Sequence, residues 1–326
     1  MPTTQMKRDT ATATATITAT GLAKSYGDKQ VLRGIDLDIP AGSVFALLGP
    51  NGAGKTTTVQ ILSTLIAADS GTARLAGRDL DREPDAIREL IGVTGQFAAV
   101  DNLLNAEENL LLMADLHHLP RREGRRRAAG LLARFDLTEA ARNPVSTYSG
   151  GMRRKLDLAM TLVGDPRIIF LDEPTTGLDP RSRRTMWEII RSLVADDGVT
   201  IFLTTQYLEE ADQLADRIAV LDGGKLVAEG TADELKRLIP GGHISLKFAD
   251  AVALDLADSH FAATARDDEE LTLQIPSDGT VPTLRAVLDI LDGAGITPEA
   301  LSQHTPDLDD VFLTLTGDKQ QQEISR

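Results

Sequence analysis

A glycine-rich segment that ends in a lysine and a threonine constrains this chain more than any other feature; it reads Gly49-Pro50-Asn51-Gly52-Ala53-Gly54-Lys55-Thr56. The apolar run at 44–48 precedes it, and a helical pattern begins at 57–62. Between a strand and a helix, the pattern G-x-x-x-x-G-K-[ST] forms a loop that cradles phosphate. Glycines let backbone N–H groups converge on an anion, and the helix N-terminus adds partial positive charge. The alternative interpretation is a glycine turn that binds no ligand. The strand before the segment and the helix after it favour the phosphate-binding loop over that alternative.

Two side chains of this segment have predicted chemical roles. Lys55 can reach the β- and γ-phosphates of a nucleotide, so it is a candidate catalytic residue, and Thr56 can place its hydroxyl on Mg²⁺. The candidate nucleotide-binding residues of the segment are Gly49, Pro50, Asn51, Gly52, Ala53, Gly54, Lys55, Thr56 and Thr57. A phosphate cradle alone, however, indicates only that a nucleotide binds.

Length, composition and charge narrow the class of protein. A chain of 326 residues suggests about two domains. The absence of cysteine excludes disulfides, zinc ribbons and thiol catalysis. There is no apolar run of about 18 residues and no hydrophobic leader, so we expect neither a membrane span nor a signal peptide. The net charge is −15, and residues 241–326 hold 16 acidic and 5 basic side chains, so nucleic acid is not an expected partner.

Apolar runs of β type recur along the first two thirds of the chain, and helical patterns separate several of them. After a first strand near Ile17, the runs lie at 44–48, 91–94, 168–171, 199–204 and 217–221. This alternation is typical of a largely parallel α/β sheet. From about 101 to 164 the pattern is helical, as at 107–116 and 124–135, which predicts a helical subdomain inserted between strands.

These patterns predict two domains and two tails. We expect a disordered tail at 1–16, a nucleotide-binding domain at 17–238, a small acidic α+β domain at 243–317 and a second tail at 318–326. The dipeptides of Pro240-Gly241-Gly242 indicate a linker. Within the second domain the predicted elements are strands at 243–248 and 270–275, a helix at 281–291 and an amphipathic segment at 308–315.

A second chemical signal follows the apolar run at 168–171, where Asp172 and Glu173 stand next to each other. Adjacent residues of a strand point to opposite sides of it, so the two carboxylates can serve different ligands. Asp172 suits the coordination sphere of Mg²⁺, usually through water, and Glu173 suits polarising the water that attacks the γ-phosphate. Acidic residues also cap strands without any function, but the phosphate cradle favours the catalytic interpretation.

A third signal is Tyr148-Ser149-Gly150-Gly151-Met152-Arg153-Arg154-Lys155, a Ser-Gly-Gly turn that opens a basic helix and again suits an anion. A second γ-phosphate site in one chain is redundant unless it serves another subunit. At this point the chain resembles the ATP-binding-cassette (ABC) ATPases, whose dimers close the Ser-Gly-Gly signature of one chain over the nucleotide of the other. The resemblance implies an α/β P-loop NTPase cassette, with a parallel sheet core and a helical subdomain, ahead of the small α+β domain.

The resemblance covers about 17–235 and implies further site residues. Tyr26 matches the aromatic residue that stacks on adenine, and Gln96 matches the glutamine that contacts Mg²⁺ and the membrane partner. Asp179 matches the loop that crosses the dimer interface. The implied cofactors are ATP and Mg²⁺; the nucleotide set then also includes Tyr26, Gln96, Ser149, Gly150, Gly151 and Asp179, and the metal set is Thr56, Gln96 and Asp172.

One position departs from the family pattern. After the strand at 199–204 most such ATPases place a histidine against the γ-phosphate, whereas this chain has Gln206. A glutamine can donate an N–H to phosphate and accept from water, but it cannot carry a positive charge. Gln206 is therefore a candidate catalytic residue, and we expect slower hydrolysis or a weaker pH dependence than a histidine gives.

The chain is similar to one branch of this family, the daunorubicin/doxorubicin-resistance ATP-binding subunits. Three segments carry this resemblance: residues 204–218, the Tyr-Ser-Gly-Gly-Met-Arg-Arg signature and residues 308–317. The match extends over nearly the whole chain and is weakest at 243–300. It implies an ATPase homodimer at the cytoplasmic face of the cell membrane, joined to a separately encoded integral-membrane permease and powering efflux of anthracycline-like hydrophobic drugs. Relatives that export lipids leave the cargo open.

Other functions stay open at this level. A soluble ABC protein that acts on ribosomes or DNA usually carries two cassettes, zinc cysteines or long coiled coils, and the sequence has none of these. A binding module that is merely switched by nucleotide is disfavoured by the presence of Glu173. Importers use the same cassette, so only the resemblance to the drug-resistance branch favours export.

Overall fold

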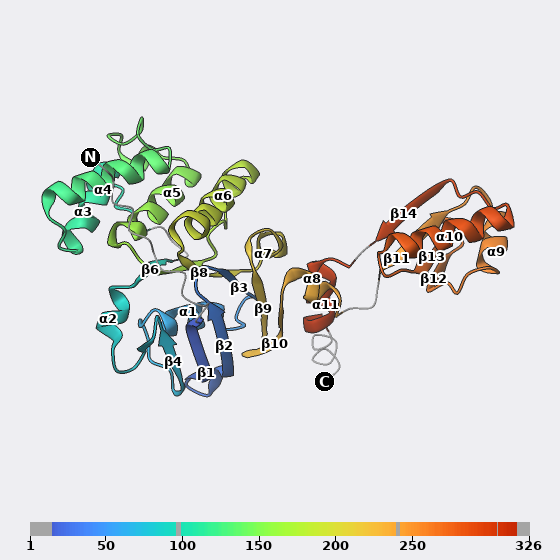
Figure 1. Cartoon of the computed structure of the whole chain (residues 1–326), viewed down its shortest axis with the longest axis horizontal. Helices are drawn as coiled ribbons and strands as arrows, with labels where there is room; N and C mark the ends of the chain where they lie inside the picture. Colours follow the sequence, from blue (N-terminus) through green and yellow to red (C-terminus); the bar gives the residue numbers. More distant parts are fainter. Residues whose placement is uncertain (1–14, 96–98, 239–241, 305, 318–326) are drawn as a thin grey trace, which may run out of the picture. The chain divides into compact units, whose positions relative to one another are not determined.

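The computed structural model describes residues 15–95, 99–238, 242–304 and 306–317 (Figure 1). It separates into two compact units, Met1–Ala232 and Asp233–Arg326. None of the helices in these described ranges is long and apolar enough to cross a membrane. The two units meet after residue 232, whereas the sequence predicts that the first domain ends at 238. The domain bounds remain a prediction.

The core of the first unit is a six-stranded sheet in the order β10-β9-β3-β8-β7-β6. Its strands are β3 (Val44–Leu48), β6 (Ile91–Thr94), β7 (Ile168–Asp172), β8 (Thr200–Thr205), β9 (Arg217–Asp222) and β10 (Lys225–Gly230). All neighbours are parallel except β10, which is antiparallel to β9. Every residue of β3, β7 and β8 is buried, because both faces of this sheet are covered. The predicted parallel α/β core is therefore confirmed.

A second, antiparallel sheet of the first unit has the order β2-β1-β4-β5. It consists of β1 (Ala15–Tyr26), β2 (Lys29–Pro40), β4 (Ser70–Leu75) and β5 (Arg78–Asp79). Continuous apolar runs mark strands that are buried on both faces, and a strand with one open face lacks such a run. The sequence therefore predicts only the first strand of this sheet. In β2 the buried residues Ile35, Leu37 and Ile39 alternate with exposed ones, as expected for a sheet with one open face.

Helices connect the strands of the central sheet. Between strands lie α1 (Lys55–Leu62), α2 (Pro84–Arg88), α6 (Pro180–Asp197) and α7 (Leu208–Leu214), and the segment between β6 and β7 holds α3 (Ala106–Leu116), α4 (Arg121–Arg134) and α5 (Gly150–Thr161). Asn105 begins α3 with a capping box that includes Glu108. Helix α4 starts three residues before the predicted position, because Pro120 ends the preceding loop and the arginine-rich first turn has no apolar period to reveal it.

The hydrophobic core of the first unit lies between its two sheets and α1. On one side of the central sheet, the rings of Phe45, Phe202 and Phe170 pack against one another in tilted pairs across β3, β8 and β7, with centroids 5.4 and 5.6 Å apart. These large buried rings hold three neighbouring parallel strands in register. The carboxyl ends of the same three strands carry the glycine-rich loop and the acidic pair, so the core fixes their relative positions.

The second unit is a four-stranded antiparallel sheet in the order β12-β13-β11-β14. Its elements are β11 (His243–Lys247), α9 (Ala251–Asp258), β12 (Ala265–Asp267), β13 (Thr272–Pro276), α10 (Val281–Ala294), β14 (Ala300–His304) and α11 (Leu308–Gly317), and α8 (Ala232–Lys236) lies at the boundary of the units. Buried Ile244, Leu246 and Leu273 pack against Leu254 and Leu291 of α9 and α10. The predicted α+β class is confirmed, and α9, β12 and β14 are additional to the predicted elements.

Candidate functional site

The glycine-rich loop runs from the end of β3 into α1, as predicted. Gly54 precedes the helix with φ +114°, in a conformation that residues with a side chain rarely adopt. A Cβ at Gly54 would lie 2.6 Å from Leu32 Cδ2, and one at Gly49 would lie 2.4 Å from the Leu221 carbonyl oxygen. Both positions therefore require glycine, and the loop backbone sits directly on β2 and β9.

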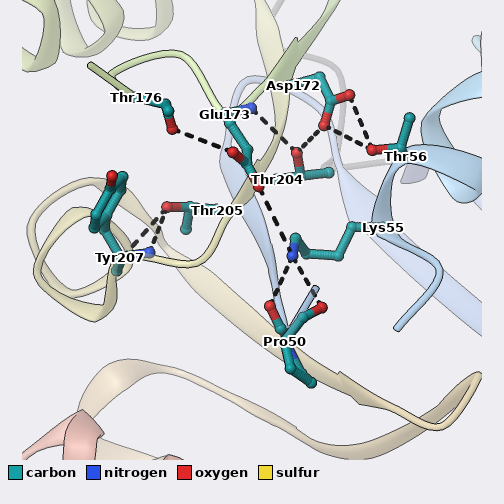
Figure 2. Close-up of polar contacts among 10 residues, drawn as sticks. Pro50, Lys55, Thr56, Asp172, Glu173, Thr176, Thr204, Thr205 and Tyr207 are labelled. Atoms are coloured by element: carbon teal, nitrogen blue, oxygen red, sulfur yellow. Dashed lines mark hydrogen bonds and ion pairs between the residues drawn. The ribbon is translucent and has the colours of Figure 1, made fainter. Parts of the chain in front are cut away.

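Lys55 is buried and folds back over this loop. Its Nζ donates to the Gly49 carbonyl at 2.7 Å and to the Pro50 carbonyl at 3.2 Å, and it lies 3.9 Å from Glu173 Oε1 (Figure 2). Burial lowers the pKa of Lys55, while the negative charges of Glu173 and Asp172 oppose that change. A buried ammonium over a loop of backbone N–H groups matches the charge of a polyphosphate, so the residues present fit the predicted nucleotide.

Thr56 and Asp172 meet although 116 positions separate them in sequence. Thr56 Oγ1 donates to Asp172 Oδ2 at 3.1 Å, and Thr204 Oγ1 donates to Asp172 Oδ1 (Figure 2). Hydroxyl and carboxylate oxygens are the ligands that Mg²⁺ prefers, and Mg²⁺ usually takes only one or two of them from protein and the rest from phosphate and water. The donor set of Thr56 and Asp172 therefore fits the predicted metal.

Glu173 has an unusual backbone for a residue with a side chain. Its φ is +49°, in the left-handed region, which costs conformational energy and persists only where the surroundings impose it. Its N–H donates to the carbonyl and to Oγ1 of Thr204, at 3.1 and 3.2 Å. Thr176 Oγ1 donates to Glu173 Oε2 at 3.2 Å, so the other carboxylate oxygen, Oε1, faces Lys55 (Figure 2).

Tyr26 ends β1 and is half exposed. Lys24 Nζ lies 5.8 Å from the centre of its ring, and Tyr26 pairs with Lys29 at the start of β2. Two residues further along β2, the Val31 carbonyl would lie 3.0 Å from a Cβ at Gly54, so this hairpin borders the glycine-rich loop. An accessible aromatic ring beside a phosphate cradle can stack on a nucleotide base.

The signature segment forms the start of α5. Ser149 caps that helix and its Oγ accepts from the Met152 N–H at 3.2 Å, while Ser149 and Gly150 are exposed. Asp179 caps α6 in the same way, accepting from the Ser182 N–H at 3.0 Å and from the Ser182 hydroxyl at 2.6 Å. A Cβ at Gly151 would lie 2.6 Å from Ser182 Oγ, so the two helix starts are adjacent.

The structure leaves two predicted residues without a defined role. Gln96 lies outside the described residues. Gln206 is exposed and follows β8, and the hydrogen bond there is made by its neighbours, since Thr205 Oγ1 accepts from the Tyr207 N–H at 2.9 Å (Figure 2). The catalytic role of Gln206 therefore stays a prediction.

Three residues of the site were not among the predicted ones. Thr204 and Thr176 hold Glu173, and nothing in a local pattern marks a threonine of a buried strand or loop as a support for a distant carboxylate. Arg154 belongs to the basic helix that follows the Ser-Gly-Gly turn, and the predicted anion site there comprises Ser149, Gly150 and Gly151 but not this side chain. It is buried and donates to the Pro174 and Asp172 carbonyls at 2.8 and 3.3 Å.

Comparison with known proteins agrees with this geometry. The model of the ABC transporter family matches residues 32–176. The daunorubicin resistance ATP-binding protein DrrA3 of Streptomyces coeruleorubidus is 49% identical over 94% of this chain and 97% of its own length. The structure of cbiO1 from Clostridium perfringens, part of an ABC transporter complex, aligns with a TM-score of 0.64 and 26% identity over 68% of this chain and 90% of its own. An ATP-binding cassette solved as a dimer in a post-hydrolysis state with ADP and phosphate aligns with a TM-score of 0.60 and 26% identity, over 66% and 98% of the two chains.

Proposed function

This chain belongs to the ATP-binding subunits of ABC transporters, in the daunorubicin/doxorubicin-resistance branch, and from this premise we propose that its ATPase activity powers export of anthracycline-like drugs or related amphiphiles. The ATPase part rests on one observation above all. Lys55 Nζ and Glu173 Oε1 lie 3.9 Å apart over the glycine-rich loop. The cation that would bind the γ-phosphate and the base that would activate the attacking water are therefore next to each other. The export part rests on the resistance protein to which nearly the whole chain is similar.

The side chains divide the work of hydrolysis among them. Lys55 and the N–H groups of the loop from Gly49 to Gly54 hold the phosphates and balance the charge that develops on the γ-phosphoryl group. Glu173 Oε1 accepts a proton from the attacking water, whose oxygen forms the new bond to phosphorus as the bond to ADP breaks. Thr56 and Asp172 would hold Mg²⁺, which neutralises phosphate oxygens when it is bound. Tyr26 stacks on the base.

A second copy of the chain completes each site in this proposal. Ser149, Gly150, Gly151 and Asp179 lie at two adjacent helix starts. The side chains of Ser149 and Asp179 cap their own helices, and Ser149, Gly150 and Asp179 are exposed, so a partner's nucleotide can reach these helix starts. The structural neighbour that was solved as a dimer with ADP and phosphate supports this arrangement. Closure of the dimer over ATP and its reopening after hydrolysis would then do work on a transport partner.

We further propose that this transport partner is a separately encoded integral-membrane permease, and that the ATPase dimer is held at the cytoplasmic face of the membrane. Family membership supports this placement, as does the neighbour that is part of an ABC transporter complex. Gln96 is the candidate contact with the permease. The net charge of −15 gives nucleic acid no favourable surface, so it is not a partner in this proposal.

Drug accumulation in cells tests the export function. Cells would express this chain together with the permease encoded next to it and be loaded with a fluorescent anthracycline; the Glu173→Gln chain with the same permease is the blank. Lower accumulation with the wild-type chain alone is the expected result. Equal accumulation in both cells would refute drug export, leave the ATPase assignment in place, and direct the search toward lipid cargo.

Gln206→His is expected to leave the affinity for Mg·ATP unchanged and to raise turnover. Gln206 is exposed and its side chain makes no hydrogen bond to the residues that the structure describes, so we expect the fold to tolerate the substitution. An imidazole would add a group that can carry charge near neutral pH, and the pH–rate profile would gain a step near its ordinary pKa of about 6.5. Nucleotide titration and ATPase assays from pH 5.5 to 8.5 measure this. Loss of ATP affinity in the variant would contradict the role assigned to Gln206.

A further inference from the structure

Arg154 and Lys55 are the two buried cationic side chains in the described part of the cassette, and Arg154 donates more hydrogen bonds than Lys55. It lies on α5, five residues after Ser149, and is 8% exposed. Its guanidinium donates four hydrogen bonds: to the Pro174 carbonyl at 2.8 Å, the Gly95 carbonyl at 2.9 Å, Asp157 Oδ2 at 3.1 Å and the Asp172 carbonyl at 3.3 Å. Of these four acceptors only Asp157 is charged, and the other three are backbone carbonyls.

The acceptors of Arg154 surround Glu173. The Asp172 and Pro174 carbonyls belong to the residues immediately before and after it, so one planar guanidinium fixes the chain on both sides of the glutamate. On the opposite side, Thr204 accepts from the Glu173 N–H. This double support explains how a non-glycine residue stays at φ +49°. Relaxation of the backbone there would swing the carboxylate away from Lys55.

The arrangement is more specific than a stabilising ion pair requires. Burying a guanidinium and a carboxylate costs desolvation that their attraction often fails to offset, and apolar residues in their place are often more stable. A pair present only for stability would need Asp157 and Arg154 alone. Here the pair also joins α5 to the loop beside β6, because Asp157 Oδ1 accepts from the Ala99 N–H at 2.9 Å while Arg154 donates to Gly95.

We propose that Arg154 is a positioning residue for hydrolysis: it holds Glu173 in the active backbone conformation and ties that conformation to helix α5. This inference rests on the proposed function, in which Glu173 is the base and Ser149, the cap of α5, faces the partner's nucleotide. A shift of α5 on engagement of that nucleotide changes the position of the Arg154 guanidinium, and thereby of Glu173 in the same chain. The two ATP sites of the dimer are thus linked through one side chain.

The test is to separate turnover from binding in Arg154 variants of the full chain. Arg154→Met is expected to lower kcat about 10- to 100-fold, because displacement of a catalytic group by about 1 Å has an effect of this size. The affinity for Mg·ATP should stay within about twofold, since no nucleotide-binding group is removed. Arg154→Lys should fall between the wild type and Arg154→Met, because an ammonium keeps the charge but cannot span carbonyls on both sides of Glu173.

Two further variants keep the test decisive. Arg154→Met leaves Asp157 buried and unpaired, so the double variant Arg154→Met/Asp157→Asn removes that charge while its amide oxygen still accepts from Ala99; thermal unfolding verifies the fold. Arg125→Met deletes an exposed arginine of α4 and should match the wild type.

Wild-type kcat in any folded Arg154 variant would overturn the proposal, as would a loss of ATP affinity equal to the loss of kcat. Glu173→Gln, assayed in parallel, separates the two levels: full activity there refutes Glu173 as the base and the inference with it, whereas an inactive Glu173→Gln beside active Arg154 variants refutes the inference alone.

Discussion

Glu173→Gln is expected to lower ATP turnover by about 10²- to 10⁴-fold, the range over which a general base contributes. Glutamine has nearly the same shape, so its side chain can still accept from Thr176, and the support of its backbone by Thr204 is unchanged. It cannot take a proton from water, however, because an amide oxygen is far too weak a base. Binding should survive, since Lys55 and the glycine-rich loop are intact.

The same substitution should trap the ATP-bound dimer. If hydrolysis reopens the dimer, a chain that binds ATP without cleaving it accumulates in the closed form. Size-exclusion chromatography with light scattering, with Mg·ATP in the buffer, would show a dimer for Glu173→Gln and a smaller dimeric fraction for the wild type. Glu188→Gln, at an exposed position of α6, is the matched control and should behave as the wild type. A variant that stays monomeric in ATP and turns over at the wild-type rate would contradict both the base and the dimer.

The sequence predicts where the glycine-rich loop and the acidic pair lie in the fold, because both signals are local. The glycine-rich loop must lie between a strand and a helix, and the acidic pair must follow a buried strand; each is written in consecutive residues. The parallel core was predictable for the same reason, since β3, β7 and β8 are continuous apolar runs. The structure then adds the distances, such as that from Lys55 to Glu173, which follow from the packing of β3 beside β8 and β8 beside β7.

What the sequence does not predict depends on contacts between distant segments. The left-handed backbone of Glu173 is imposed by Thr204 and Arg154, which lie 31 and 19 positions away in the chain, and no local pattern records such support. The antiparallel sheet is missed because half-buried strands such as β2 carry too few apolar residues in a row. In the second unit β14 is largely exposed, so its apolar signal is weak and its strand is set by pairing with β11.

Complementation between two inactive chains should restore activity, if each ATP site is built from two copies of the chain. Gly150→Asp is the chosen signature variant: Gly150 is exposed, its φ is not positive, and a Cβ there would meet only Leu178 Cδ2, at 4.0 Å. An aspartate at this helix start suits the helix dipole but repels the phosphates of the partner's nucleotide. Gly130→Asp on α4, where a Cβ has open space, is the matched control and should keep full activity.

Homodimers of Gly150→Asp and of Glu173→Gln are each expected to be inactive, because every site in them carries a lesion. Heterodimers isolated through two different affinity tags are the informative species. Pairing Gly150→Asp with Glu173→Gln places both lesions in one site and leaves the other intact, so activity should return, to at most about half of the wild-type level because one of two symmetry-related sites works. Pairing the wild-type chain with the double variant Gly150→Asp/Glu173→Gln puts one lesion in each site and should stay inactive. If each chain hydrolysed ATP by itself, the activities of the two heterodimers would be reversed. This single comparison therefore decides whether the exposed start of α5 acts on the nucleotide of its own chain or on that of the partner.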